Sequence, residues 1–471
     1  MQDVQGRQRM WPAIATIAAM RPSMTDRPLW LTFLLFLGPM LASNILQALS
    51  GTINNIYLGQ MLGVKALAAA AVFFPVLFFF IAFVIGLASG STVLIGQAWG
   101  AKNRDKVKAI AGTTLGAGVL LGCAVALVGG VFVEGMLRGL GTPADILPEA
   151  VRYARVMFMA VPLLFTFILY TSMLRGVGDT VTPLLALILS SAVGLTLTPA
   201  FIRGWGGLPQ LGVTSAAWGT VISMTVALVG LGLYLRHKKH VMAPDAQLHR
   251  HMNIEWKLLK PVLRLGLPTG LFMVTSSSAD LILLSVVNGF GSNATAAWGA
   301  VAQVTAYVQF PAMSIGITSS ILAAQAIGAG NNDRLIAIVR TGLGMSLVVT
   351  GSLVLLGAVF ARDIAGLFIT SVPVLDLTQT VLRISLFGSL FFGLASVFSG
   401  VMRASGTVLV PTIISLGCLV IILAPAGWLL SRAVGVHGVW MAYPITFLCA
   451  LLLQATYFQR VWRRKEIRKL V

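Results

Sequence analysis

Charged residues are scarce in this chain of 471 residues. Only 10% are Asp, Glu, Lys or Arg, whereas a soluble domain carries about 25%. That shortage excludes an ordinary soluble enzyme, and the 57% of hydrophobic residues indicates an integral membrane protein. Acidic residues are the scarcest of the charged types, with 14 Asp and Glu against 33 Lys and Arg. Any carboxylate inside an apolar run therefore stands out.

Cysteine is also scarce, and the three present all fall in apolar runs, so the sequence predicts no disulfide framework. We expect no metal site either, because the histidines of one lysine-rich stretch have only loose spacings: His237, His240, His249 and His251. The chain lacks a nucleophile with a paired base and a phosphate-binding loop of the Walker spacing. These patterns predict a protein that is not an enzyme, needs no cofactor and does not use ATP directly.

Long apolar runs dominate the chain. A spanning helix needs about 20 apolar residues, and the sequence contains twelve such segments, at about 29–50, 66–95, 109–133, 151–174, 181–202, 212–235, 259–289, 294–325, 336–360, 379–401, 407–431 and 436–459. The predicted fold class is therefore an all-α integral membrane protein with twelve transmembrane helices.

The basic residues are unevenly distributed between the two sides of these segments. If both tails and the loops after even-numbered segments share one side, that side holds 25 of the 33 Lys and Arg, and the other side holds 8. Cytoplasmic loops carry such an excess, so both termini are predicted to lie in the cytoplasm. The net charge of +19 then reflects orientation and contact with anionic membrane lipids, and we expect no nucleic-acid partner.

An internal repeat divides the chain into two halves. The sequence QAWGAKNRDK at 97–106 returns as QAIGAGNNDR at 325–334, and RGVGDTVTP at 175–183 returns as RASGTVLVP at 403–411, with the same displacement along the chain. Six spans per half predict parallel lobes related by a pseudo-twofold axis along the membrane normal. The expected parts are an N-terminal tail at 1–28, an N-lobe at 29–235, a linker at 236–258, a C-lobe at 259–460 and a basic tail at 461–471. Arg175 and Arg403 lie at matching turns, after the fourth and the tenth span, where we expect them to bond helix C-terminal carbonyls.

Asp280 lies well inside the predicted span 259–289, whereas the other acidic residues fall in tails, loops or at segment ends. An ionisable group at membrane depth is expensive and marks a functional site or a buried partner. Ser276 and Ser277 lie one helical turn earlier. We interpret these three residues as an ion-coupling site for a proton or a small cation. The alternative is a neutral carboxyl group that hydrogen-bonds another helix.

Two sets of uncharged polar residues are candidates for the lining of a substrate cavity. Gln47, Ser50 and Asn54 share one face of the first span, and Gln303 and Tyr307 lie one turn apart in the eighth. The first set is equally well explained as a contact between helices. The alternative for Tyr307 is a packed interface with its hydroxyl group satisfied.

The chain resembles the multidrug and toxic compound extrusion (MATE) transporters from about residue 29 to 460. The resemblance is carried by the twelve spans, the loops GQAWGAKNRDK and LRGVGDTVTP with their second copies, and the segment INNIYLGQMLGVKALAA. It implies a bacterial inner-membrane protein with V-shaped lobes around a central cavity. It also implies export of cationic or amphiphilic compounds in exchange for protons or sodium ions. The chain departs from the family where members carry acidic residues, because the matching positions are Asn54, Thr198, Ser276 and Phe392.

These observations together predict a monomeric secondary antiporter for small organic compounds, working by alternating access. One carboxylate at membrane depth favours a proton over a sodium ion, which needs several oxygen ligands. Two alternatives remain open. A lipid-linked saccharide flippase would need several cations in its cavity, and few arginines fall within the spans. An uncoupled facilitator would agree with Asn54 in place of an acidic residue.

Overall fold

The computed structural model describes residues 28–471 except residue 370, so almost all of the predicted tail at 1–28 lies outside the described residues. Its regular elements are helices, and twelve of them are long and apolar enough to cross a membrane. These spans are α2 with η1 (Leu29–Leu62), α3 (Val64–Gly100), α4 (Arg104–Gly139), α5 (Leu147–Gly176), α6 (Val181–Arg203), α7 (Thr214–His237), α9 (Trp256–Asn288), α10 (Ser292–Gly328), α11 to α12 (Arg334–Val359), α14 (Val372–Ala404), α15 to α16 (Leu409–Val434) and α17 with η5 (Val436–Arg464).

Two of the spans are interrupted by π-helical turns, η3 (Ser346–Thr350) and η4 (Cys418–Leu423), and the first span ends in another, η1 (Leu58–Leu62). The pieces around them are α2 (Leu29–Tyr57), α11 (Arg334–Met345), α12 (Gly351–Val359), α15 (Leu409–Gly417) and α16 (Ala424–Val434). The remaining elements are η2 (Trp205–Gly207), α8 (Ala246–Arg250), α13 (Ala361–Gly366), α17 (Val436–Arg460) and η5 (Trp462–Arg464). Most helices extend a few residues beyond the predicted apolar runs, because polar turns continue them. For example, the side chain of Asn103 accepts a hydrogen bond from the backbone N–H of Lys106 at 3.0 Å.

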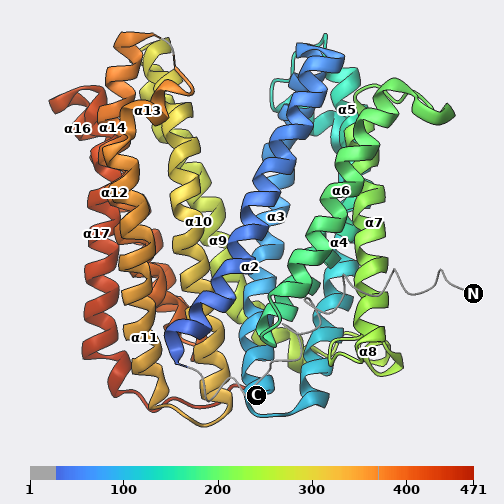
Figure 1. The fold of residues 1–471 in the computed structure, drawn as a ribbon, viewed down its shortest axis with the longest axis vertical. Coiled ribbons are helices and arrows are strands. Elements are labelled where there is room, and N and C mark those ends of the chain that lie inside the picture. Colours follow the sequence, from blue (N-terminus) through green and yellow to red (C-terminus); the bar gives the residue numbers. More distant parts are fainter. Residues whose placement is uncertain (1–27, 370) are drawn as a thin grey trace, which may run out of the picture.

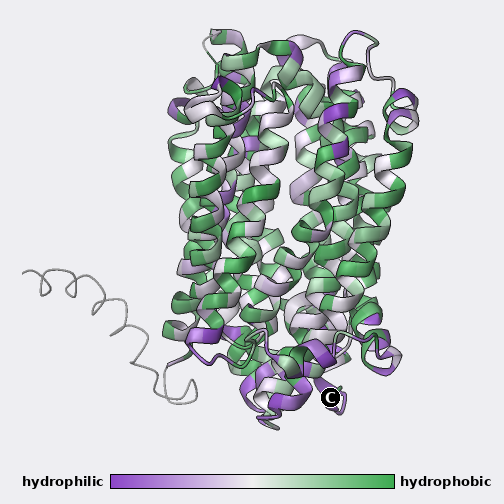
Figure 2. Cartoon of the chain, turned by 90° about the vertical axis from the view of Figure 1, so that its right-hand side faces the viewer, coloured by the Kyte–Doolittle hydropathy of each residue, from purple (hydrophilic) through white to green (hydrophobic). Residues whose placement is uncertain are grey.

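The helices form two lobes, and the predicted fold class is confirmed. Helices α2 to α7 make one lobe and α9 to α17 make the other (Figure 1). Apolar residues cover the middle of the bundle, whereas polar residues gather at its two ends (Figure 2). This distribution is the one that a bilayer requires, since every spanning segment must satisfy its backbone internally and present apolar side chains to lipid.

The first helix of each half crosses beneath the other half at one end of the bundle. There α2 packs against α10 and α11, and α9 packs against α3 and α4. The backbones of α3 and α9 meet closely, because a Cβ atom on Gly86 would lie 2.6 Å from the carbonyl oxygen of Gly266. We call this end the linker end, since α8 and the rest of the linker lie there. The lobes meet at the linker end and diverge toward the opposite end (Figure 1).

Glycine turns at the opposite end show that the repeat extends to backbone geometry. Gly63 precedes α3 with φ 91° and ψ 175°, and Gly291 precedes α10 with φ 97° and ψ 175°. Glycine adopts positive φ without the steric penalty that other residues meet. The two hairpins are therefore built alike, at equivalent positions of the repeat.

The linker is docked on the N-lobe. The hydroxyl group of Tyr170 in α5 donates a hydrogen bond to the carbonyl oxygen of Met242, and Lys108 in α4 pairs with Asp245. Asp245 also caps α8, because its side chain accepts from the backbone N–H of Leu248 at 2.9 Å. The linker therefore belongs structurally to the N-lobe, and only its end, where α9 begins, connects to the C-lobe.

Candidate functional site

A central cavity of about 460 Å³ lies between the lobes. Side chains from α2, α3, α5, α6 and α7 line it on one side, and side chains from α9, α10, α14, α15 and α17 line it on the other. Its walls mix apolar groups with hydroxyl and amide groups. The phenylalanines and methionines of the C-lobe wall are Phe272, Met273, Met313, Phe392 and Phe447. Such a lining suits ligands that are largely apolar and carry a few polar groups.

A reciprocal pair of glutamines connects the two lobes next to the cavity. Gln97 in α3 donates from Nε2 to the carbonyl oxygen of Ala404 at 2.7 Å, and Gln325 in α10 donates from Nε2 to that of Gly176 at 2.9 Å. The two glutamines, like the two acceptors, occupy equivalent positions of the repeat. Each glutamine satisfies a carbonyl group that the end of a helix leaves free. These two hydrogen bonds hold the last turns of α5 and α14 at equivalent places. We call the contact that they make between the lobes the seam.

Two arginines line the cavity beside these helix ends. Arg175 and Arg403 occupy the last turns of α5 and α14, next to the carbonyls that the glutamines bind. The expectation that they bond helix C-terminal carbonyls is wrong, because that contact belongs to Gln97 and Gln325. Arg403 instead donates to the hydroxyl group of Ser89 at 3.1 Å. The sequence repeat identified both positions, but it did not reveal that they face a cavity.

The polar face predicted for the first span is only partly in the cavity. Gln47 lines it, at the same level as Asn44, whose side chain donates to Ser314 of the other lobe at 3.2 Å. Ser50 and Asn54 lie nearer the opposite end and do not line it. Ser50 donates to Ser191 of α6 at 2.9 Å, which is a contact between helices inside the N-lobe.

Asn54 and Thr198 are two uncharged polar side chains of the N-lobe. The side-chain oxygen of Asn54 is buried and accepts no hydrogen bond from the described residues. Thr198, in α6, donates to the carbonyl oxygen of Gly194 at 2.8 Å and is buried. None of these side chains can gain or lose a proton near neutral pH. A titrating switch inside this lobe would have to come from other residues.

Asp280 has a defined partner inside the C-lobe. The hydroxyl group of Tyr443 in α17 donates to Asp280 Oδ1 at 2.7 Å. Asp280 lies seven residues beyond Met273, the last residue of α9 in the cavity wall, which is about 10 Å along the helix toward the opposite end. The carboxylate therefore points across its own lobe to α17 and lies outside the central cavity.

Aromatic contacts connect this carboxylate to the cavity wall. The ring of Tyr443 lies 6.3 Å from that of Trp298 and 6.2 Å from that of Phe447. Phe447 in turn lies 5.3 Å from Phe392, and both line the cavity. If the hydrogen bond between Asp280 and Tyr443 changed, the resulting shift would be transmitted to the cavity wall through the packed rings of Tyr443 and Phe447. Sequence spacing gave no indication of Tyr443, which comes from another helix.

The other predicted residues lie near Asp280 or apart from it. Ser276 and Ser277 are half-buried on α9, and neither donates to Asp280 among the hydrogen bonds of the described residues. Gln303 and Tyr307 are exposed on α10, with 3.5 Å between Gln303 Nε2 and the Tyr307 hydroxyl group, and they lie outside the cavity wall. The roles assigned to these four residues stay predictions.

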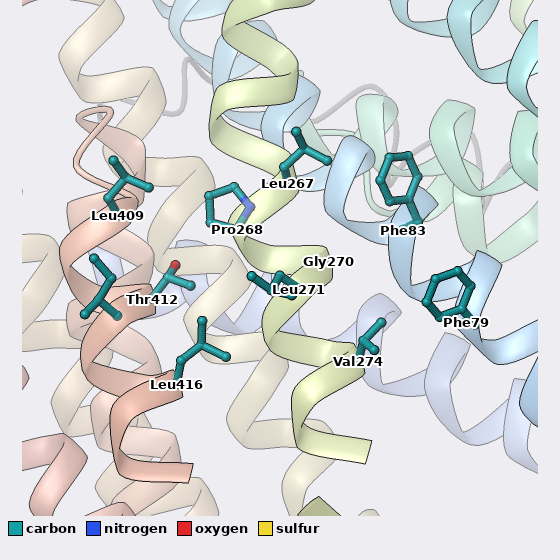
Figure 3. Close-up of a pocket in the computed structure, with 11 residues that line it drawn as sticks. Phe79, Phe83, Leu267, Pro268, Gly270, Leu271, Val274, Leu409, Thr412 and Leu416 are labelled. Carbon is teal, nitrogen blue, oxygen red and sulfur yellow. The ribbon is translucent and has the colours of Figure 1, made fainter. Parts of the chain in front are cut away.

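A second pocket, of about 470 Å³, lies on the far side of α9 from the central cavity. Leu267, Leu271 and Val274 of α9 face it, together with side chains of α3 and α15 (Figure 3). Thr412 of α15 lines both spaces, and the other side chains around the second pocket are apolar. Helix α9, which contains Pro268 at this level, is thus a thin wall between an apolar pocket and the cavity.

Comparisons with known proteins agree with this architecture. The model of the MatE family matches residues 39–200 and 268–429, once in each lobe. The probable multidrug resistance protein YoeA of Bacillus subtilis (strain 168) is 42% identical over 444 residues, which cover 94% of this chain and 96% of that protein. The FAD transporter of Shewanella oneidensis is 27% identical and covers 86% and 89%. A structure described as the outward-facing conformation of a multidrug resistance MATE family transporter has a TM-score of 0.83 at 23% identity and covers 91% and 94%.

Proposed function

Because the chain belongs to the MatE family of multi-pass membrane transporters, we propose that it is a proton-coupled antiporter that expels amphiphilic organic compounds from the cell. It would act in the inner membrane as a monomer, without a cofactor, and by alternating access. The observation that carries the proposal is a cavity between two repeated lobes, with a carboxylate at membrane depth in one of them. A secondary transporter needs these two features: a central site and a group that responds to an ion gradient.

Asp280 would be the proton-binding group. When its carboxylate is ionised, it accepts a charge-assisted hydrogen bond from Tyr443, and such bonds are about twice as strong as neutral ones. Protonation would weaken the link between α9 and α17. Tyr443 and Phe447 would then shift, and with them the cavity wall. Proton binding would in this way favour one packing of the C-lobe over another, which is the requirement for coupling.

The orientation follows from charge. The linker end carries most of the basic loops, so we place it in the cytoplasm. The lobes meet at this end, and the described conformation would therefore close the cavity to the cytoplasm and release substrate outward. The apolar pocket beside α9 would give lipid-dissolved compounds a route toward Thr412 and the cavity.

Efflux from sealed vesicles tests the proposal. The purified protein is reconstituted into liposomes, and export of fluorescent amphiphiles is measured under an imposed proton gradient, an imposed sodium gradient and no gradient. We expect protons to drive export, and Asp280→Asn to abolish gradient-driven export while the protein still binds substrate. Asp376→Asn, a change to an exposed carboxylate outside the cavity, is the matched control and should export normally. Sodium-driven export that Asp280→Asn leaves intact would contradict the proposal.

Two uncharged positions in the N-lobe give one observation in favour of an uncoupled facilitator. Asn54 and Thr198 take the places where family members have acidic residues, so one lobe has no titrating group at these positions. A facilitator would move substrate downhill at the same rate with and without a proton gradient, and Asp280→Asn would not slow it. A flippase would require a lipid-linked sugar as substrate. Family membership alone does not fix the substrate, since the similar proteins include a probable multidrug resistance protein and an FAD transporter.

A further inference from the structure

The charge of the central cavity is positive. Among the described residues that line it, Arg175 and Arg403 are the charged ones, and no carboxylate is present. Asp280, the acidic residue at membrane depth, lies about 10 Å farther along α9 and binds Tyr443. A cationic compound that entered the cavity would therefore meet two like charges and no opposite charge.

Both arginines are fixed in position by the seam. Each belongs to the last turn of a helix whose next carbonyl group is bound by a glutamine of the other half, Gln325 or Gln97. The negative end of a helix dipole favours a cation in its last turn, which helps to hold a guanidinium group there. Because the two helix ends are equivalent under the internal repeat, the arginines face the cavity from opposite sides of the seam.

Most of the hydrogen-bonding capacity of these arginines is unused. A guanidinium group carries five N–H donors in a planar fork. Arg403 uses one of its nitrogens on Ser89. Arg175 makes no hydrogen bond or ion pair with the described residues, and the repeat explains why: the position equivalent to Ser89 is Ile317, which has no acceptor. Charged groups in an apolar setting are costly without a partner, so both arginines favour the arrival of an anion.

We infer that the central cavity binds amphiphilic organic anions, with Arg175 and Arg403 as its two anion-binding side chains. The arginine fork matches the two oxygens of a carboxylate, sulfonate or phosphate group. The apolar part of the ligand would pack on Phe272, Phe392 and Phe447 across the cavity. This inference rests on the proposed efflux function and narrows the cationic or amphiphilic compounds that the family resemblance implies to amphiphilic anions.

Two probes that differ in head-group charge test the inference. 1-Naphthylacetate and 1-naphthylmethylammonium share an aromatic body and carry opposite charges. Binding of each to the purified full chain in a neutral detergent at low ionic strength is measured by isothermal titration calorimetry. We expect the unmodified protein to bind the anion at least about tenfold more tightly than the cation. Equal affinities, or a preference for the cation, would overturn the inference without any variant being needed.

Substitutions then locate the site. Arg175→Gln and Arg403→Gln should each raise the Kd for 1-naphthylacetate about tenfold or more, the range expected for loss of a hydrogen bond to a charged group. Arg155→Gln, on the exposed face of the same α5, is the matched control and should leave that Kd unchanged. Arg175→Glu should raise affinity for the cation. Unchanged anion binding in both Gln variants would overturn the assignment.

Two further measurements distinguish a lipid anion from a soluble anion, and a failure of the proposed efflux function from a failure of the inferred anion binding. Competition by short-chain phosphatidylglycerol, but not by phosphatidylcholine, would identify a lipid phosphate as the occupant of the two arginines; competition by neither would support a soluble anion. Arginine-dependent anion binding without gradient-driven efflux would refute the proposed function alone. Gradient-driven export of 1-naphthylmethylammonium at equal affinity for both probes would refute this inference alone.

Discussion

Replacing Gly100 or Gly328 by alanine should force the lobes apart where they meet. These glycines face each other's helices at the seam, next to Gln97 and Gln325. A Cβ atom on Gly100 would lie 2.0 Å from the carbonyl oxygen of Gln325, and one on Gly328 would lie 1.9 Å from that of Gln97. Both obstacles are backbone atoms, so no side chain can rotate away. The seam therefore depends on the absence of two methyl groups.

The size of the effect follows from these distances. Ordinary contact begins at 3.4 Å, so a methyl group at Gly100, only 2.0 Å from a backbone oxygen, requires the two helices to separate by more than an ångström. Overpacking of this kind typically costs about 1–3 kcal/mol. If the cost falls only on the conformation in which the lobes meet, the population of that conformation falls about 5- to 150-fold relative to the alternative. The hydrogen bond from Gln97 to Ala404, at 2.7 Å, would also break.

Cysteine labelling measures that population. A single cysteine replaces Ser89, a cavity residue, in a protein whose native cysteines are changed to alanine. A membrane-impermeant maleimide is added to the linker side of sealed vesicles. We expect slow labelling of the parent, and faster labelling when Gly100→Ala is added, in proportion to the lost population of the closed conformation.

The matched control is Gly130→Ala. Gly130 lies inside α4, and a Cβ atom there would meet nothing within 4 Å. Alanine in a helix interior is favoured over glycine by about 0.5–1 kcal/mol, so this variant should fold at least as well as the parent. If Gly100→Ala labels at the parent rate, or if Gly130→Ala labels as fast as Gly100→Ala, the reasoning about the seam is wrong.

Two other perturbations address the carboxylate link and the linker. Tyr443→Phe removes the hydrogen bond donor to Asp280 with little change of shape, and should reduce proton-driven efflux about tenfold while downhill flux persists. Unchanged proton-driven efflux would show that Tyr443 takes no part in coupling. At the linker, burial raises the pKa of Asp245, but hydrogen bonds from Lys108 and from the backbone of Leu248 outweigh it and lower the pKa below its ordinary value. A lowered carboxyl pKa means that docking is intact above the ordinary value of about 3.9 and is lost only as pH falls through the lowered one. At neutral pH the ionised carboxylate of Asp245 holds the linker on Lys108. Asp245→Asn removes that charge and should speed tryptic cleavage within residues 236–255 severalfold, and equal cleavage rates would contradict this.

The sequence was sufficient to predict the spans, the repeat and the family. Apolar runs of about 20 residues can be counted, and the constant displacement between the two halves can be seen by aligning the chain with itself. The structure and the two MatE matches confirm the twelve spans and the resemblance to the family. Helix ends were less predictable, because polar turns extend helices beyond their apolar part, as at Asn103, whose side chain caps α4.

The contacts of the candidate site could not be predicted from the sequence, for a physical reason. Periodicity shows which residues share a face of one helix, but it does not show which other helix that face meets. Tyr443 is 163 residues from its partner Asp280, and nothing local distinguishes it from other tyrosines. Arg175 and Arg403 were assigned to helix capping because their position in the helix permits it; only the packing of α3 and α10 shows that glutamines take that place. The coupling ion stays a prediction.

The repeat preserves the parts that form the seam and changes the parts that would respond to an ion. Gln97 and Gln325 make equivalent bonds, and Arg175 and Arg403 face the same cavity. By contrast, the position equivalent to Asp280 is Thr52, which bonds the carbonyl group of its own helix at 3.0 Å. A symmetric seam would let either lobe move against the other, whereas the proposed role of Asp280 would place the ion response in the C-lobe. We therefore expect proton binding to repack α9 against α17 while the N-lobe, with the linker docked on it, moves as one body.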